Sequence, residues 1–173
     1  MKRKWLLLIV ALALPGMIFT FLKYFGKNEF DVPVMFSSGT ISVPGACTTS
    51  VVAPYEIQKS SKIPIRGLTA VAFVASHQGK ELDGYRFQLD RIIAEFEGSD
   101  FDVIIVDTTR KNLSDVLLSS GDYEQEMNCH FLLDGKRSVV LVDGSRHIRG
   151  QYEASQKDLE RLAVEVKILL KNY

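Results

Sequence analysis

The sequence predicts an α/β domain, with a central mixed sheet flanked by helices, behind one N-terminal transmembrane helix. Residues 68–75 are a continuous apolar run, as expected for a strand that is covered on both faces, and residues 101–106 indicate a second buried strand. Residues 85–96 and 159–170 carry apolar residues at helical spacing. Residues 5–22 are apolar and uncharged. The chain is 173 residues long with 46% hydrophobic content, which is enough for one ordinary core.

These patterns divide the chain into three predicted segments. We expect a membrane anchor with basic flanks at residues 1–27, a stalk and peripheral hairpin at residues 28–67, and the α/β domain at residues 68–173.

The charge balance argues against nucleic-acid binding. Lys and Arg total 21, as do Asp and Glu, but five of the basic residues and none of the acidic ones precede residue 28. The remainder therefore holds 16 basic against 21 acidic groups, a mildly acidic body without the basic face that nucleic acids need.

The apolar run at residues 5–22 reaches the lower end of the length that a helix needs to cross a hydrocarbon core of about 30 Å. Three basic residues precede it and two follow, so the positive-inside rule places the N-terminus in the cytoplasm and the domain outside. The alternative is a cleaved signal peptide with its small-residue site at residues 11–13. Apolar residues continue for nine positions beyond that site, which favours an uncleaved anchor.

The segment between the anchor and the domain is rich in turns. Residues 27–65 hold four of the five prolines, and short β-like pieces at residues 32–36 and 50–57 lie between the turns. This pattern predicts a stalk and a hairpin on the edge of the domain.

The domain begins with the strand at residues 68–75, followed by a polar loop and a helix whose buried stripe is Tyr85, Leu89, Ile92, Ile93 and Phe96. Gly98 is available to stop this helix. The second strand, at residues 101–106, leads to a short helix predicted at residues 112–119 with Gly121 behind it. Residues 124–133 fit neither a helix nor a strand clearly.

A hairpin and a helix complete the domain. Strands are predicted at residues 138–142 and 147–152, joined by the turn signal Asp143-Gly144. Ser155 and Asp158 form a capping-box pattern for the last helix. The order strand, helix, strand, helix, hairpin, helix gives a parallel β-α-β unit with an antiparallel edge, which is a thioredoxin-like fold.

With these elements in place, the chain resembles the SCO/SenC family of exported, membrane-anchored copper proteins with a thioredoxin-like fold. The resemblance rests on the strand ending at Ala75-Ser76 and on residues 140–152, VLVDGSRHIRGQY, where that family has Asp-x-x-G-x-I-R-G-Y-Y after a hydrophobic strand. It implies a single-pass protein of the bacterial inner membrane with a periplasmic domain, and a protein partner in cytochrome c oxidase assembly or another envelope complex.

The chain departs from that family at the site of chemistry. The two cysteines of the family's Cys-x-x-x-Cys motif fall on His77 and Glu81, and the family's distal histidine is expected near Gly135, where the nearest histidine is His130. No proline follows Pro64, so the cis-proline of thioredoxin-type enzymes has no counterpart. Disulfide exchange needs an attacking thiolate, which the loop after the first strand lacks.

A substitute metal site is one interpretation of the residues near this loop. His77, Glu81, Cys129 and His130 are able to ligate copper or zinc, and the fold brings their segments toward one end of the sheet. The alternative is that His77 and His130 are surface residues and that Glu81 suits the helix dipole. Beyond copper at this site, no cofactor is expected.

The two cysteines, Cys47 and Cys129, have three interpretations. An oxidising compartment permits a disulfide between them. This bond would tie the stalk and hairpin at residues 28–67, called the extension below, to the domain. Cys129 as a free thiol, buried or partly buried, is the second. A reactive peroxidase-type cysteine is disfavoured, because neither residue opens the first core helix, where the dipole lowers a thiol pKa.

Two polar clusters lie elsewhere. His147 with Arg149 is either solvated or able to touch an acidic partner, and Asp107-Thr108-Thr109 ends a core strand where α/β folds place sites but also where such residues cap turns. Three functions follow in order of preference: a redox-inactive binding or assembly module, a copper-handling assembly factor using substitute ligands, and a thiol-dependent peroxidase or reductase.

Overall fold

The computed structural model describes residues 13–21, 31–41, 43, 47, 51–109 and 114–172. The chain divides into two compact units, Met1–Asp31 and Val32–Tyr173. Residues 13–21 are helical, and the rest of the predicted membrane span lies outside the described residues. Within the described part of the chain, no helix is long and apolar enough to cross a membrane.

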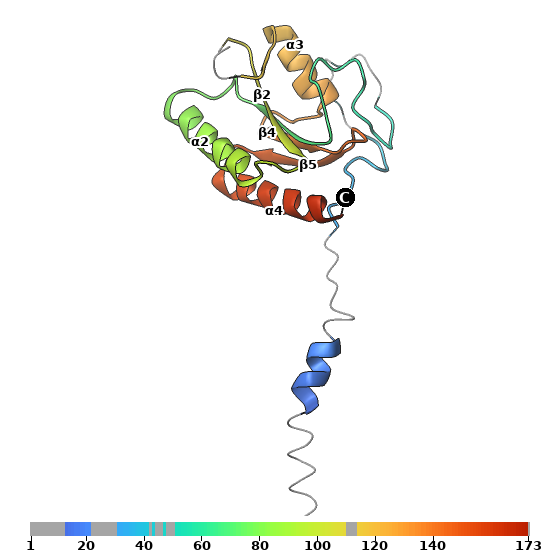
Figure 1. The fold of residues 1–173 in the computed structure, drawn as a ribbon. Helices are drawn as coiled ribbons and strands as arrows, with labels where there is room; N and C mark the ends of the chain where they lie inside the picture. The colour runs from blue at the N-terminus through green and yellow to red at the C-terminus, as the bar shows by residue number, and fades with distance from the viewer. Residues whose placement is uncertain are drawn as a thin grey trace, which may run out of the picture. The chain divides into compact units, whose positions relative to one another are not determined.

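The second unit is a five-stranded mixed sheet with helices on it (Figure 1). In chain order its elements are β1 (Leu68–Phe73), α2 (Gly79–Glu95), β2 (Phe101–Asp107), β3 (Val116–Leu117), α3 (Ser120–Gln125), the π-helical turn η2 (Glu126–His130), β4 (Arg137–Val142), β5 (Ile148–Glu153) and α4 (Gln156–Asn172). The strand order is β3-β2-β1-β4-β5. Strands β1, β2 and β3 are parallel to one another, and β4 is antiparallel to both of its neighbours, β1 and β5. This arrangement confirms the predicted thioredoxin-like fold with a mixed sheet.

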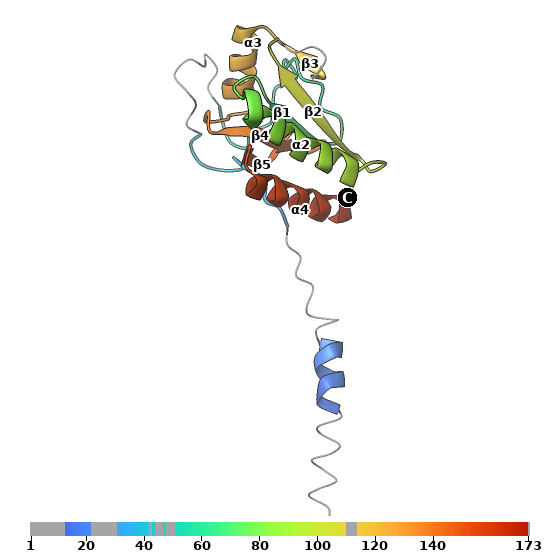
Figure 2. The ribbon, with the colours of Figure 1, turned by 90° about the vertical axis from the view of Figure 1, so that its left-hand side faces the viewer.

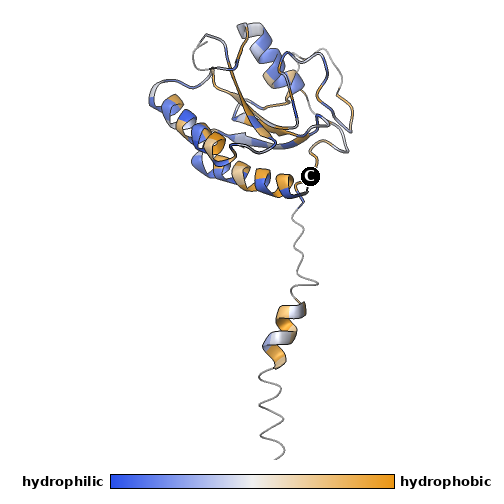
Figure 3. Cartoon of the chain, viewed as in Figure 1, coloured by the Kyte–Doolittle hydropathy of each residue, from blue (hydrophilic) through white to orange (hydrophobic). Residues whose placement is uncertain are grey.

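Helices α2 and α4 cover one face of the sheet, as two views at right angles show (Figures 1 and 2). Apolar residues gather on the strands and along stripes of these two helices (Figure 3). The core on this face includes Leu89 from α2 and Leu162 from α4, both fully buried. One residue of the predicted stripe departs from it, because Ile93 is 42% exposed. The stripe of α2 is therefore narrower than the sequence indicates.

The opposite face is covered by the extension before β1 together with α3 and η2. Tyr55, Ile57 and Ile63 of the extension pack with Phe73 of β1 and Phe131 after η2 in a second apolar core. Among the described residues of the extension, an antiparallel bridge joins Thr40 to Val52, and part of the predicted hairpin lies outside those residues. The backbone of the extension also bonds to the β4–β5 hairpin: the Met35 amide donates to the Ile148 carbonyl at 2.8 Å and the Ile57 amide to the Arg146 carbonyl at 2.9 Å.

The helix predicted at residues 112–119 is wrong where the structure describes it. Val116 and Leu117 form β3, which pairs with Val106 and Asp107 of β2. The helix starts later because the side chain of Ser119 accepts the Asp122 amide at 3.2 Å and caps α3. Tertiary pairing at the sheet edge has overridden local helix preference here.

A close approach on β5 requires glycine. A Cβ atom at Gly150 would lie 2.1 Å from the hydroxyl of Tyr152, two residues along the same strand. The Tyr152 ring lies over this position, and its hydroxyl donates to the Glu165 carboxylate of α4. Burial and this carboxylate raise the pKa of Tyr152. The ring thus links β5 to α4 over a strand position that has no side chain.

Candidate functional site

His77 in the loop after β1 and Glu81 in the first turn of α2 form a pair of imidazole and carboxylate. His77 Nδ1 lies 3.0 Å from Glu81 Oε1, and the His77 ring packs edge-on against Tyr85 with centroids 4.9 Å apart. The Glu81 side chain is 71% exposed, whereas that of His77 is 14% exposed. Glu81 also opens α2 as its first-turn acid, which suits the helix dipole.

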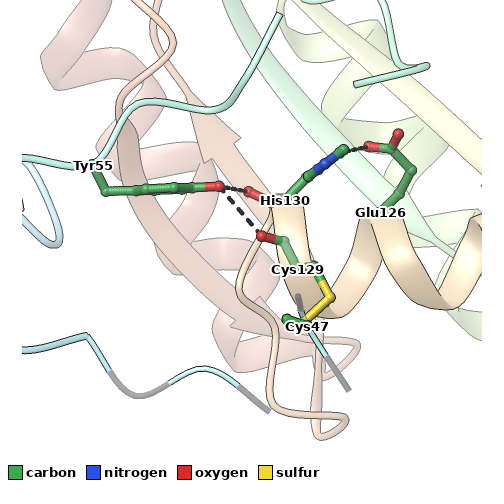
Figure 4. The surroundings of a disulfide bond; sticks show 5 residues. All are labelled: Cys47, Tyr55, Glu126, Cys129 and His130. Carbon is green, nitrogen blue, oxygen red and sulfur yellow. Dashed lines mark hydrogen bonds and ion pairs between the residues drawn. A yellow bond between two sulfur atoms is a disulfide. The ribbon is translucent and has the colours of Figure 1, made fainter. Parts of the chain in front are cut away.

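The cysteines are joined to each other on the face covered by the extension. Cys47 and Cys129 form a disulfide with their Cα atoms 5.5 Å apart (Figure 4). This is one of the three alternatives that the sequence left open. Because the chain has only two cysteines, both sulfurs are used in this bond. In this oxidised form the chain holds no thiol for nucleophilic attack.

A buried carboxylate organises the turn that carries Cys129. Glu126 is only 3% exposed and accepts hydrogen bonds from the Ser61 hydroxyl and the Lys62 amide, both at 2.7 Å. Nδ1 of His130 lies 3.0 Å from the same carboxylate (Figure 4). The sequence did not single out Glu126 or Ser61, because they lie 65 residues apart and no local pattern connects them.

Tyr55 adds a second link between the extension and η2. Its hydroxyl donates to the carbonyl of His130 at 2.8 Å (Figure 4). Burial, with a smaller contribution from the charge of Glu126, raises the pKa of Tyr55 to about 12. The phenol is therefore a neutral donor at physiological pH. Tyr55, Ser61 and Lys62 thus join the extension to the turn that carries Cys129.

The predicted composite metal site is not assembled. Cys129 is bonded to Cys47 and cannot supply a thiolate, and His130 faces Glu126. His77 pairs with Glu81, its neighbour one helical turn along the chain. Over the residues that the structure describes, no group of three or more His, Cys, Asp and Glu side chains is placed to hold a metal ion.

The β4–β5 hairpin, residues 140–152, carries a set of internal ion pairs and hydrogen bonds. Arg149 is buried, lies 3.3 Å from the Asp143 carboxylate and donates to the Val32 carbonyl. His147 lies 3.6 Å from Asp143 and 3.5 Å from Glu56. The Arg149 guanidinium therefore faces an acid of its own domain, and contact of His147 and Arg149 with an acidic partner stays a prediction.

Other contacts complete this set at the β4–β5 turn. Arg146 donates to the carbonyls of Ile57 and Gln58 at 2.7 and 2.8 Å, so it clamps the extension to the turn.

Asp107, fully buried at the end of β2, accepts the amides of Thr108 and Thr109 at 2.6 and 3.5 Å. The strand end at Asp107 thus caps a turn, which was the simpler of its two interpretations.

Comparisons with known proteins add little to this geometry. No family model matches the chain, and a search of curated proteins finds no match. Among solved structures, it is similar to the solution structure of a "putative protein disulfide isomerase" from Bacteroides thetaiotaomicron, at 17% identity and a TM-score of 0.45 over 61% of this chain and 74% of that one. It is also similar to that of a "putative thiol-disulfide oxidoreductase" from Bacteroides vulgatus, at 13% identity and a TM-score of 0.39 over 59% and 71%.

Proposed function

We propose that this chain is a membrane-anchored, exported thioredoxin-fold module that binds a protein partner and carries out no disulfide exchange. One observation carries the proposal: both cysteines of the chain are bonded to each other, and the loop after β1 and the first turn of α2 present His77 and Glu81 in place of thiols. A thioredoxin-like fold without a thiol in this loop retains a binding scaffold and lacks the attacking group of the reaction.

Export and anchoring are supported by two further features. Disulfides persist in oxidising compartments such as the bacterial periplasm, which agrees with a domain outside the inner membrane. The apolar run at residues 5–22, with its basic flanks, supports a single-pass anchor with the N-terminus inside. The resemblance to SCO/SenC proteins favours a respiratory oxidase or another envelope complex as the partner.

The first experiment measures disulfide exchange. The full chain is incubated with insulin and a dithiol, beside a Cys47→Ser/Cys129→Ser double variant. We expect both proteins to reduce insulin at the rate of the buffer alone. A faster rate that disappears in the double variant would overturn the proposal, because it would make the Cys47–Cys129 pair a catalytic disulfide.

The second experiment tests the partner and the anchor together. The full chain is cross-linked in intact cells of its source, membranes are washed with carbonate, and the adduct is identified by mass spectrometry. We expect the chain to stay in the washed membrane, bonded to one envelope protein in a constant ratio. Recovery of the chain in the carbonate wash would contradict the membrane anchor. The absence of an adduct from several cross-linker positions would contradict the binding role.

A further inference from the structure

We propose that the outer edge of β2, at residues 101–103, is a docking edge to which an extended, basic segment of a partner protein adds as a new strand. This inference rests on the proposed binding function and names its surface and the chemistry of its partner. Strand addition draws affinity from main-chain hydrogen bonds and specificity from pockets that take alternate side chains. Both requirements are met at this edge.

The first requirement is a length of strand edge that no described strand covers. In the described residues β3 pairs with β2 only at Val106 and Asp107, so residues 101–103 extend past the end of β3. The outward direction is fixed by Ile105, whose amide donates to the Asp115 carboxylate at 2.8 Å and whose carbonyl accepts the Asp115 amide at 2.9 Å. Because strand residues alternate, the amide of Val103 points outward too.

The outward amide of Val103 is held by a replaceable partner. It donates to the carboxylate of Asp102, the residue before it, at 2.9 Å. Asp102 is exposed, so its side chain can swing into solvent. A charged residue that covers its own strand edge prevents indiscriminate pairing. A basic strand would take over the amide and pair with the carboxylate that it releases.

The second requirement is room for side chains on both faces of the edge. On the α2 face a cavity of about 430 Å³ is lined by Ile93, Phe96 and Val103 among others. On the opposite face a cavity of about 260 Å³ is lined by Pro64 and Val116 with the same strand. Alternate side chains of an added strand would enter these two cavities in turn. The exposure of Ile93, unexpected from its place in the stripe of α2, gives the larger cavity an apolar wall.

The charge of the linings selects a basic occupant. Asp90, Glu97 and Asp102 line the cavity on the α2 face, and its lining contains no Lys or Arg. On the opposite face Asp102 and Asp115 stand against Arg66. Both linings are net acidic beside apolar walls, which complements a strand that alternates Lys or Arg with aliphatic residues.

The test uses the full chain and a fluorescent probe peptide of about eight residues that alternates Lys and Val, with blocked ends. Fluorescence anisotropy measures affinity, and amide hydrogen exchange followed by mass spectrometry locates the site. We expect binding that slows exchange in residues 101–107. A matched Glu-Val peptide, and a Lys-Val peptide N-methylated at alternate residues, should each bind at least about tenfold more weakly.

Two variants separate the edge from the general acidity of the domain. Asp102→Lys should weaken the Lys-Val peptide at least about tenfold, whereas Asp83→Lys, at an exposed position on α2 outside both linings, should change the affinity less than about twofold. Equal losses in the two variants would overturn the proposal, because they would indicate diffuse charge attraction. Thermal melting confirms that both variants are folded.

The remaining outcomes are equally decisive. No binding at millimolar peptide, slowed exchange only at other segments, or equal binding of the N-methylated peptide would each reject the docking edge. A partner cross-linked to another face, together with no peptide binding at residues 101–103, would reject the docking edge and retain the proposed binding function. Peptide binding at residues 101–103 with no partner found in cells would retain the docking edge and reject the proposed binding function.

Discussion

The two faces of the sheet are covered in different ways. On one face α2 and α4 pack through apolar side chains such as Leu89 and Leu162, which recur at helical spacing. On the other, the extension is held by a disulfide, by the buried carboxylate of Glu126 and by Arg146, which join residues far apart in the sequence. Both faces have an apolar core, but only the face covered by the extension adds a few discrete links that join distant parts of the sequence.

Removing the disulfide should give the largest effect. The Cys47–Cys129 bond closes a loop of 82 residues, for which chain entropy predicts a loss of about 4.5 kcal/mol in the free energy of unfolding. Urea unfolding of the Cys47→Ser/Cys129→Ser double variant measures it, with the wild type in reductant as a second route to the same state. A loss under about 1 kcal/mol would mean that the discrete links on this face do not depend on the disulfide.

Truncating the helical face should cost somewhat less. Leu89→Ala removes a fully buried side chain between α2 and the sheet, and we expect a loss of about 3 kcal/mol. The loss should be the same, within about 0.5 kcal/mol, in the wild type and in the disulfide-free variant, since Leu89 belongs to the core on the opposite face of the sheet from the extension. A larger coupling in this double-mutant cycle would show that the two faces are not independent.

The same difference explains how much of each face could be predicted from the sequence. Leu89 and Leu162 were found because helical periodicity repeats over many residues, and Asp143-Gly144 because a tight turn is encoded by neighbours. Glu126 was missed because its partner Ser61 lies 65 positions earlier. Strand β3 was taken for helix because its pairing with β2 is a tertiary contact.

Neutralising Glu126 should weaken only the face of the sheet that the extension covers. Glu126→Gln keeps the shape but loses the charge that accepts from Ser61 and Lys62, and we expect a loss of about 2 kcal/mol. The exposed neighbour Glu124 provides the control, because Glu124→Gln should stay within about 0.5 kcal/mol of the wild type. Equal losses in the two variants, measured by urea unfolding, would remove Glu126 from the set of discrete links.

The link made by Tyr55 should be visible in alkali. Its folded pKa of about 12 lies above the usual tyrosine value of 10.0, so its contribution is present below pH 10 and is lost as pH rises toward 12. Tyr55→Phe should cost about 1 kcal/mol at pH 7 and should make the stability fall less steeply between pH 10 and 12. Unfolding curves at several pH values check both; identical slopes would show that Tyr55 titrates normally.

The smallest effect is expected at His77. Its contact with Glu81 is a local pair, and His77→Ala should change stability by less than about 1 kcal/mol. Titration with Cu(I) should give the same result for the wild type and the variant, since Cys129 is bonded to Cys47. Tight binding that the variant loses would restore the metal interpretation of the loop.

Gly150 and Tyr152 constrain the drift of the sequence at β5. A side chain at position 150 collides with the Tyr152 ring that reaches Glu165. Substitutions at positions 150 and 152 are therefore tolerated only in compatible pairs. In a library randomised at both sites and selected for folded protein, larger residues at position 150 should survive only beside a small residue at position 152. Single replacements of Gly150 alone should be purged, so substitutions at this pair should accumulate jointly.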